Sequence, residues 1–211
     1  MRAADAATIL RMLIVALVVY LIVIRYDALI TVLLFVVATA LDAVDGYLAA
    51  WQASGYRLGF LTYARASIGR DRLAMSRASK YKSISAKQSG FGPRMDVAGD
   101  RFAEYAMWVV FAAVSIIPLF IVMAVIFIHS IADAMMGARG TSSHMRTRFA
   151  KAVYTSNASR GLINVLKIAT FGYLMLVYID AYPMVYGYVL MYALFAFIAV
   201  RGAAEIIEGA R

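Results

Sequence analysis

The sequence contains no cysteine and little charge, and both absences limit the classes of protein to which it can belong. Without cysteine, a disulfide framework, a thiolate metal site and a thiol nucleophile are excluded. Charged residues make up only 16% of the 211 residues, whereas hydrophobic residues make up 64%. A soluble domain of this composition would have too little polar surface to cover itself. The N-terminal stretch MRAADAATILR lacks the cleavage site of a secretory signal peptide, so none is expected. The composition predicts an integral membrane protein.

Long apolar segments predict an all-α membrane protein with six transmembrane helices. A helix needs about 20 residues to cross the hydrocarbon core of a bilayer. The stretch 105–136 carries one charge, Asp133, and is too long for a single crossing. It fits two crossings only if the first begins near Arg94 and the chain turns near Pro118. The expected spans are residues 8–24, residues 28–49, these two crossings, residues 161–179 and residues 184–200.

Basic residues gather in two of the expected connections and set the orientation. Residues 51–91 hold eight basic residues and one acidic residue, and residues 139–160 hold five basic residues. Positively charged loops remain in the cytoplasm. Six spans place both basic segments and both termini on the cytoplasmic side of the cell membrane, whereas five would separate the segments. The net charge of +9 follows from this bias, so we expect contact with anionic lipid headgroups and no nucleic-acid partner.

Residues 51–91 form a basic insert between the second and third spans, within a single domain that covers residues 1–211. The apolar positions of the insert suit a helix that lies on the lipid headgroups. These positions are Leu58, Phe60, Leu61, Tyr63, Ile68, Leu73 and Met75. A flexible basic loop is an equal alternative. Both interpretations place the insert at the cytoplasmic surface.

Two pairs of carboxylates lie where the second span ends and the third begins. Asp42 and Asp45 are three residues apart, and Asp96 and Asp100 are four residues apart, so each pair occupies one face of a helix. The two helices are joined on the cytoplasmic side, so the pairs can meet at one depth. Four carboxylates near a bilayer are tolerable if they hold divalent cations, and oxygen ligands suit Mg²⁺ or Mn²⁺. The alternative is that the aspartates are solvated helix ends.

The acidic pairs belong to a longer pattern, Asp42-x-x-Asp45-Gly46-x-x-Ala49 followed by Gly92-x-x-x-Asp96-x-x-x-Asp100. This pattern resembles the signature of the CDP-alcohol phosphotransferases, which are six-span membrane enzymes of phospholipid synthesis. The entry to the first span, Asp5-x-x-Thr8-x-x-Arg11, is similar to the N-x-x-T-x-x-R of that family. Two positions depart from it: Ala50 replaces the signature arginine, and 41 residues separate the half-motifs, many more than is usual. These departures leave open an altered substrate or an inactive chain.

The resemblance implies roles for the matching residues. It implies metal ligands at Asp42, Asp45, Asp96 and Asp100, and nucleotide contacts at Asp42, Gly46, Ala49 and Gly92. Asp100 would also be the general base, and the cofactor would be two Mg²⁺ or Mn²⁺ ions. The implied reaction transfers a phosphoryl-alcohol unit from a CDP-linked lipid to an acceptor hydroxyl and releases CMP. Homodimers are common in that family, so a homodimer is an open alternative.

The stretch SSHMRTRFA, residues 142–150, is similar to a motif of family members that use inositol phosphate. Arg146 and Arg148 match its basic positions, and Arg160 lies twelve residues after Arg148, in the stretch NASRGLINVL. These three arginines are candidates for binding an acceptor phosphate. The alternative is that they are ordinary positive-inside charges. Inositol phosphate, glycerol phosphate, serine and other polyol phosphates all remain open as acceptors.

Two other functions fit part of the sequence. A cation transporter or channel would also place carboxylates in a membrane. However, the acidic pairs are expected at one membrane face, and the chain shows no evident inverted repeat. A non-catalytic relative that still binds nucleotide is the other alternative.

Overall fold

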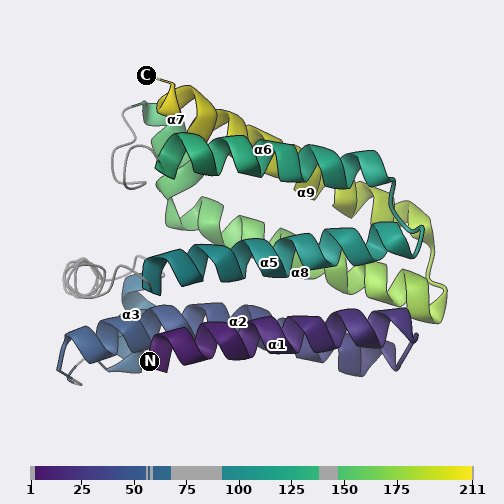
Figure 1. Cartoon of the computed structure of the whole chain (residues 1–211), viewed down its shortest axis with the longest axis horizontal. Helices are drawn as coiled ribbons and strands as arrows, with labels where there is room; N and C mark the ends of the chain where they lie inside the picture. Colours follow the sequence, from purple (N-terminus) through teal and green to yellow (C-terminus); the bar gives the residue numbers. More distant parts are fainter. Residues whose placement is uncertain (1–2, 56, 58, 68–91, 138–146, 211) are drawn as a thin grey trace. The chain divides into compact units, whose positions relative to one another are not determined.

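The computed structural model describes residues 3–55, 57, 59–67, 92–137 and 147–210, and among these residues it contains helices and no strand (Figure 1). The contacts divide the chain into two compact units. One unit consists of Met1–Tyr20 and Leu33–Ala106, and the other of Leu21–Val32 and Met107–Arg211. The expected all-α class is confirmed for the described residues. The interpretation of residues 1–211 as one domain stays a prediction.

The first unit is built from four helices or parts of helices. They are α1, Ala3–Val23; α2, Ala28–Ala53; α3, Phe60–Ser67; and the first part of α5, Gly92–Ala113. Helix α1 has an exposed apolar face and a buried face. Leu10, Leu13 and Leu17 are exposed at helical spacing, whereas Arg11 and Val15 are buried. An exposed leucine stripe beside a partly polar buried stripe is the pattern of a helix that faces lipid on one side.

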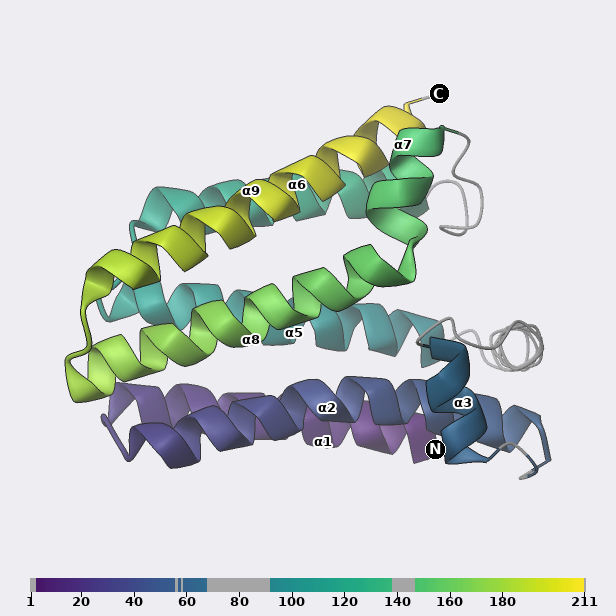
Figure 2. The same cartoon turned by 180° about the vertical axis from the view of Figure 1, so that it is seen from behind.

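The second unit contains the C-terminal helices. They are α6, Leu119–Gly137; α7, Arg148–Ala150; the π-helix η2, Lys151–Thr155; α8, Asn157–Asp180; and α9, Met184–Gly209. Helix α9 packs against both α6 and α8, and α8 and α9 form a hairpin (Figure 2). Ala181, with a φ of 57°, ends α8, and the Tyr173 hydroxyl donates to the Pro183 carbonyl at 2.9 Å. The expected turn at Asp180 and Pro183 is therefore confirmed.

Two glycines bring α9 close to α6. Gly202 faces Ile128, and Gly209 faces Met135. The two contacts are therefore seven residues apart on both helices. A Cβ added at Gly209 would lie 2.5 Å from the Met135 Cβ. Transmembrane helices commonly pack through small residues of this kind, because apolar side chains gain little by leaving lipid.

Four described helices are long and apolar enough to cross a membrane: Asp5–Val23, Ala28–Gln52, Ala158–Asp180 and Met184–Gly209. A shorter apolar helix covers Leu119–Met135. Helices α5 and α6 begin and end near the bounds expected for the two middle spans, with Pro118 in the turn between them. Helix α5 is less apolar because its first thirteen residues include five charged residues, Arg94, Asp96, Asp100, Arg101 and Glu104. The structure therefore supports a membrane protein.

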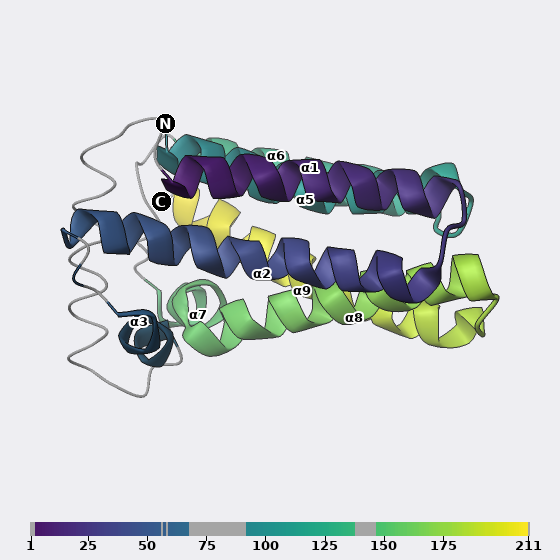
Figure 3. The same cartoon turned by 90° about the horizontal axis from the view of Figure 1, so that it is seen from below.

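Part of the basic insert is helical. Helix α3 is seen end-on in Figure 3, where α2 runs across the view, so the two helices cross steeply. The Tyr47 ring on α2 contacts the Phe60 and Tyr63 rings on α3, with centroids 5.3 and 5.6 Å apart. Leu61 is 71% exposed. The remaining apolar positions of the insert, Ile68, Leu73 and Met75, lie outside the described residues, as does Leu58.

Candidate metal centre

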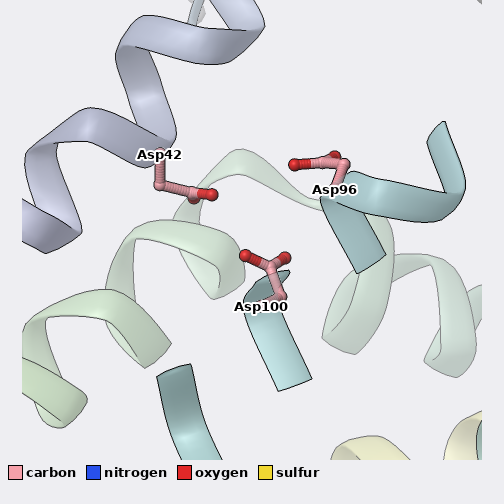
Figure 4. A group of neighbouring side chains, drawn as sticks. All are labelled: Asp42, Asp96 and Asp100. Atoms are coloured by element: carbon pink, nitrogen blue, oxygen red, sulfur yellow. The ribbon is translucent and has the colours of Figure 1, made fainter. Parts of the chain in front are cut away.

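Three of the four motif aspartates come together in the first unit. Asp42 extends from α2, and Asp96 and Asp100 extend from successive turns of α5 (Figure 4). One carboxylate oxygen of each residue lies within 4.8 Å of those of the other two. Asp42 is partly exposed, and Asp96 and Asp100 are exposed. The expected meeting of the two half-motifs is therefore present for these three side chains.

The fourth aspartate, Asp45, lies on α2 one turn after Asp42, but its side chain lies outside the described part of the chain. Gly46 and Ala49 follow at the fourth and seventh positions after Asp42, so they lie on or close to the same face of α2. Gly92 is the first residue of α5, four positions before Asp96. The residues expected to contact nucleotide therefore belong to α2 and α5, the two helices that carry the carboxylates.

An arginine from a third helix contacts the carboxylates of Asp42 and Asp100. Nη1 of Arg11, on α1, donates to Oδ1 of Asp42 and lies 2.8 Å from Oδ1 of Asp100. The side chain of Arg11 is only 3% exposed, so the guanidinium is buried against the cluster. The sequence places Arg11 in the motif at the entry to the first span but assigned it no role in the site. Its position at a turn-by-turn spacing with Asp5 and Thr8, which are also buried, is the signal that could have indicated an inward-facing polar stripe.

Gly99 allows α5 to approach α1 at this point. A Cβ added at Gly99 would lie 2.7 Å from Nη2 of Arg11 and 2.7 Å from Cγ2 of Thr8. Real Cβ atoms essentially never come so close to another heavy atom, so any larger residue would displace its neighbours. Gly99 stands between the motif aspartates at a position where the family pattern accepts any residue. Its role is to make room for the guanidinium.

The donor set fits a hard divalent cation. Three carboxylates supply oxygen ligands, which Mg²⁺ and Mn²⁺ prefer, and no described histidine joins the group. The three carboxylates and the Arg11 guanidinium together carry a formal net charge of −2. One divalent cation would neutralise these four side chains. The three aspartates could therefore hold a metal ion.

Ala50, which stands where the signature of the resembled family has an arginine, is buried. Ala50 is fully buried on α2, with an exposed fraction of 0%. An arginine there would need space and a partner for its charge. Arg65, which follows an alanine in the insert as the signature arginine would, lies on α3, and its side chain lies outside the described part.

The predicted acceptor arginines lie in the second unit or beyond the described residues. Arg146 is outside them, and Arg148 begins α7, with its side chain not described. Arg160 is exposed in the first turn of α8. The structure therefore leaves the acceptor role of all three as a prediction.

Helix α9 holds both ends of the segment from Thr147 to Ser159. The Thr147 backbone N–H donates to the buried Glu208 carboxylate at 2.9 Å. Seven residues earlier on α9, Nη1 of Arg201 donates to the Ser159 hydroxyl at 3.0 Å. Sequence reasoning gave these residues no role. Glu208 and Arg201 thus hold the chain just before and just after the segment that contains α7 and the π-helix η2. Arg148 lies one residue after Thr147, and Arg160 lies one residue after Ser159.

Comparison with protein-family models, with curated proteins and with solved structures found no match to this chain. The function is therefore argued from the carboxylate cluster and its surroundings.

Proposed function

We propose that the protein is a metal-dependent CDP-alcohol phosphotransferase of phospholipid synthesis. It would transfer a phosphoryl-alcohol unit from a CDP-linked lipid to an acceptor hydroxyl and release CMP. The observation that supports this proposal is the convergence of Asp42, Asp96 and Asp100, at the spacing of the family signature, into one group of carboxylates. That convergence joins a sequence pattern to a spatial arrangement able to bind Mg²⁺ or Mn²⁺.

The proposed reaction replaces a phosphoanhydride bond with a phosphate ester bond. The acceptor oxygen forms a bond to the phosphorus that carries the lipid alcohol, and the bond from that phosphorus to the bridging oxygen of the pyrophosphate breaks. The electron pair of the broken bond leaves with CMP. Bound divalent cations would supply positive charge to the pyrophosphate and the departing phosphate.

Each residue of the cluster has a role in this proposal. Asp42, Asp45 and Asp96 would hold the cations, and Asp100 would hold a cation and accept the proton of the acceptor hydroxyl. The ion pair to Arg11 uses Oδ1 of Asp100, so we assign the proton to Oδ2. Gly46, Ala49 and Gly92 would leave space for the cytidine nucleotide.

We propose six membrane crossings with both termini in the cytoplasm. The proposal adds α5 and α6 to the four helices that are long and apolar enough by themselves. The polar first half of α5 would lie at the cytoplasmic headgroups, which is where a lipid substrate and a soluble acceptor can both reach the carboxylates. The excess of basic residues in segments 51–91 and 139–160 supports this orientation.

Cysteine labelling tests the orientation, and the absence of native cysteine makes each introduced thiol unique. We expect Arg77→Cys, in the basic insert, to react with a membrane-impermeant maleimide only after cell lysis. Tyr182→Cys, in the exposed turn between α8 and α9, should react in intact cells. Labelling of Arg77→Cys from outside, or protection of Tyr182→Cys, would contradict the six-span topology.

The acceptor would carry its own phosphate, bound by Arg146, Arg148 and Arg160. Losing one charge-assisted hydrogen bond costs on the order of 1.5–3 kcal/mol, or roughly ten- to a hundredfold in affinity. We therefore expect Arg148→Ala to raise the acceptor KM by that factor and to leave the KM for the CDP-lipid nearly unchanged. Equal losses for both substrates would indicate a structural role. Full activity of this variant with an unphosphorylated acceptor would reject the phosphate pocket.

The function is tested by measuring CMP release from purified protein in lipid nanodiscs with CDP-diacylglycerol. The acceptors to be screened are inositol phosphate, glycerol 3-phosphate and serine, each with Mg²⁺, with Mn²⁺ and with EDTA. Metal-dependent CMP release that requires one acceptor would support the proposal. Nucleotide binding without release would instead identify a non-catalytic relative. Cation flux into sealed vesicles, without nucleotide binding, would identify a transporter or channel.

A further inference from the structure

We infer that Arg11 is a built-in counter-ion of the carboxylate cluster and that it competes with the divalent cation for it. The inference rests on the metal centre of the proposed function and adds a residue that controls how tightly the cation is held. Removing the guanidinium should therefore tighten cation binding. This expectation is the opposite of what a merely supporting role for Arg11 would give.

The guanidinium already binds carboxylates that a cation would also bind. Nη1 of Arg11 pairs with Asp42 on α2 and, at 2.8 Å, with Asp100 on α5. These residues are two of the three whose carboxylates lie close enough to share a cation. One nitrogen thus bridges the two helices that bring the half-motifs together. With no divalent cation bound, this positive charge offsets the repulsion between the carboxylates.

Arg11 is always positively charged, and its side chain is buried. A guanidinium does not lose its proton in proteins, and the Arg11 side chain is only 3% exposed. Its Nη2 lies against Gly99, where an added Cβ would be 2.7 Å away. A buried charge that left its partners would lose their compensation. The guanidinium therefore stays beside a cation that enters the cluster, and the two positive charges repel each other.

A supporting role and a competing role predict opposite changes in affinity. If Arg11 only placed the carboxylates, its removal would scatter them and weaken cation binding. Asp96 and Asp100, however, are placed by their own helix, one turn apart on α5. The loss of a nearby positive charge should therefore outweigh the loss of positional support.

The test measures Mn²⁺ binding to the full chain in nanodiscs by electron paramagnetic resonance of the free ion. We expect Arg11→Gln to bind Mn²⁺ at least tenfold more tightly than the wild type, a change of about 1.4 kcal/mol. Arg11→Lys keeps the positive charge and should stay near the wild-type affinity. In thermal melts, Arg11→Gln should be less stable than the wild type in EDTA and gain more from Mn²⁺, because a tighter ligand stabilises the folded state more.

A matched control removes a positive charge elsewhere in the chain. Arg25 is exposed in the turn between α1 and α2, fourteen residues after Arg11, so Arg25→Gln should leave Mn²⁺ affinity unchanged. Unchanged or weaker Mn²⁺ binding by Arg11→Gln would overturn the inference, and so would a variant that is unfolded both in EDTA and in Mn²⁺. The metal centre itself would survive that result if Asp96→Asn lost Mn²⁺ binding. Absence of Mn²⁺ binding in both the wild type and Arg11→Gln would overturn both.

Discussion

Asp96→Asn is expected to reduce metal-dependent CMP release by roughly 10³-fold or more, which corresponds to a barrier increase of about 4 kcal/mol. The substitution keeps the shape of the side chain but removes the negative charge of one of the three clustered carboxylates. Asp96 is exposed, and substitutions at exposed positions usually change stability little, so folding should be spared. Steady-state CMP release and a thermal melt of the same preparation would measure both effects.

Asp96 is the preferred position for this test because it is exposed, whereas Asp42 is only partly exposed and forms an ion pair with the buried Arg11. Asp42→Asn should abolish activity as well, but it also removes an ion pair from the buried guanidinium. Asp180→Asn is the matched control, since Asp180 is an exposed carboxylate at the end of α8. We expect it to retain wild-type activity. Near-normal CMP release by Asp96→Asn would reject the assignment of the cluster as the metal centre.

The helices could be predicted well from local properties of the chain. Uninterrupted apolar runs, with polar residues and Pro118 or Pro183 in the breaks, indicated where helices begin and end. The helices of the structure extend beyond the predicted spans: α2 ends at Ala53, and α9 at Gly209. Hydropathy identifies the part of a helix that lipid surrounds, whereas the helix itself continues into the polar headgroup region.

The centre of the carboxylate cluster could be predicted only in part. Spacing within each helix predicted that Asp96 and Asp100 share a face, because the helical repeat is a local property. Spacing could not show that Arg11 pairs with both Asp42 and Asp100, because these contacts join segments far apart in the sequence. A single arginine near the start of an apolar run has the same local pattern whether it faces headgroups or a buried partner. Only the packing of α1 against α5 distinguishes the two.

Gly99→Ala is expected to destabilise the protein, although alanine is the better helix former. Within a helix, replacing glycine by alanine ordinarily gains about 0.5–1 kcal/mol. At Gly99 the new Cβ would meet Nη2 of Arg11 and Cγ2 of Thr8, each at 2.7 Å. Overpacking of this kind typically costs about 1–3 kcal/mol, so the net change should lower the melting temperature. Gly99→Val, which adds two more carbons, should lower it further.

Gly161→Ala is the matched control for Gly99→Ala, because it makes the same change in a helix without close neighbours. Gly161 lies in α8, and a Cβ there would have nothing within 4 Å. This control should leave the melting temperature unchanged or raise it, since only the helix preference of alanine acts. Because the displaced atom at Gly99 belongs to Arg11, Gly99→Ala should also alter Mn²⁺ affinity, whereas Gly161→Ala should not. A melting temperature for Gly99→Ala equal to that of Gly161→Ala would show that α1 and α5 do not approach each other this closely.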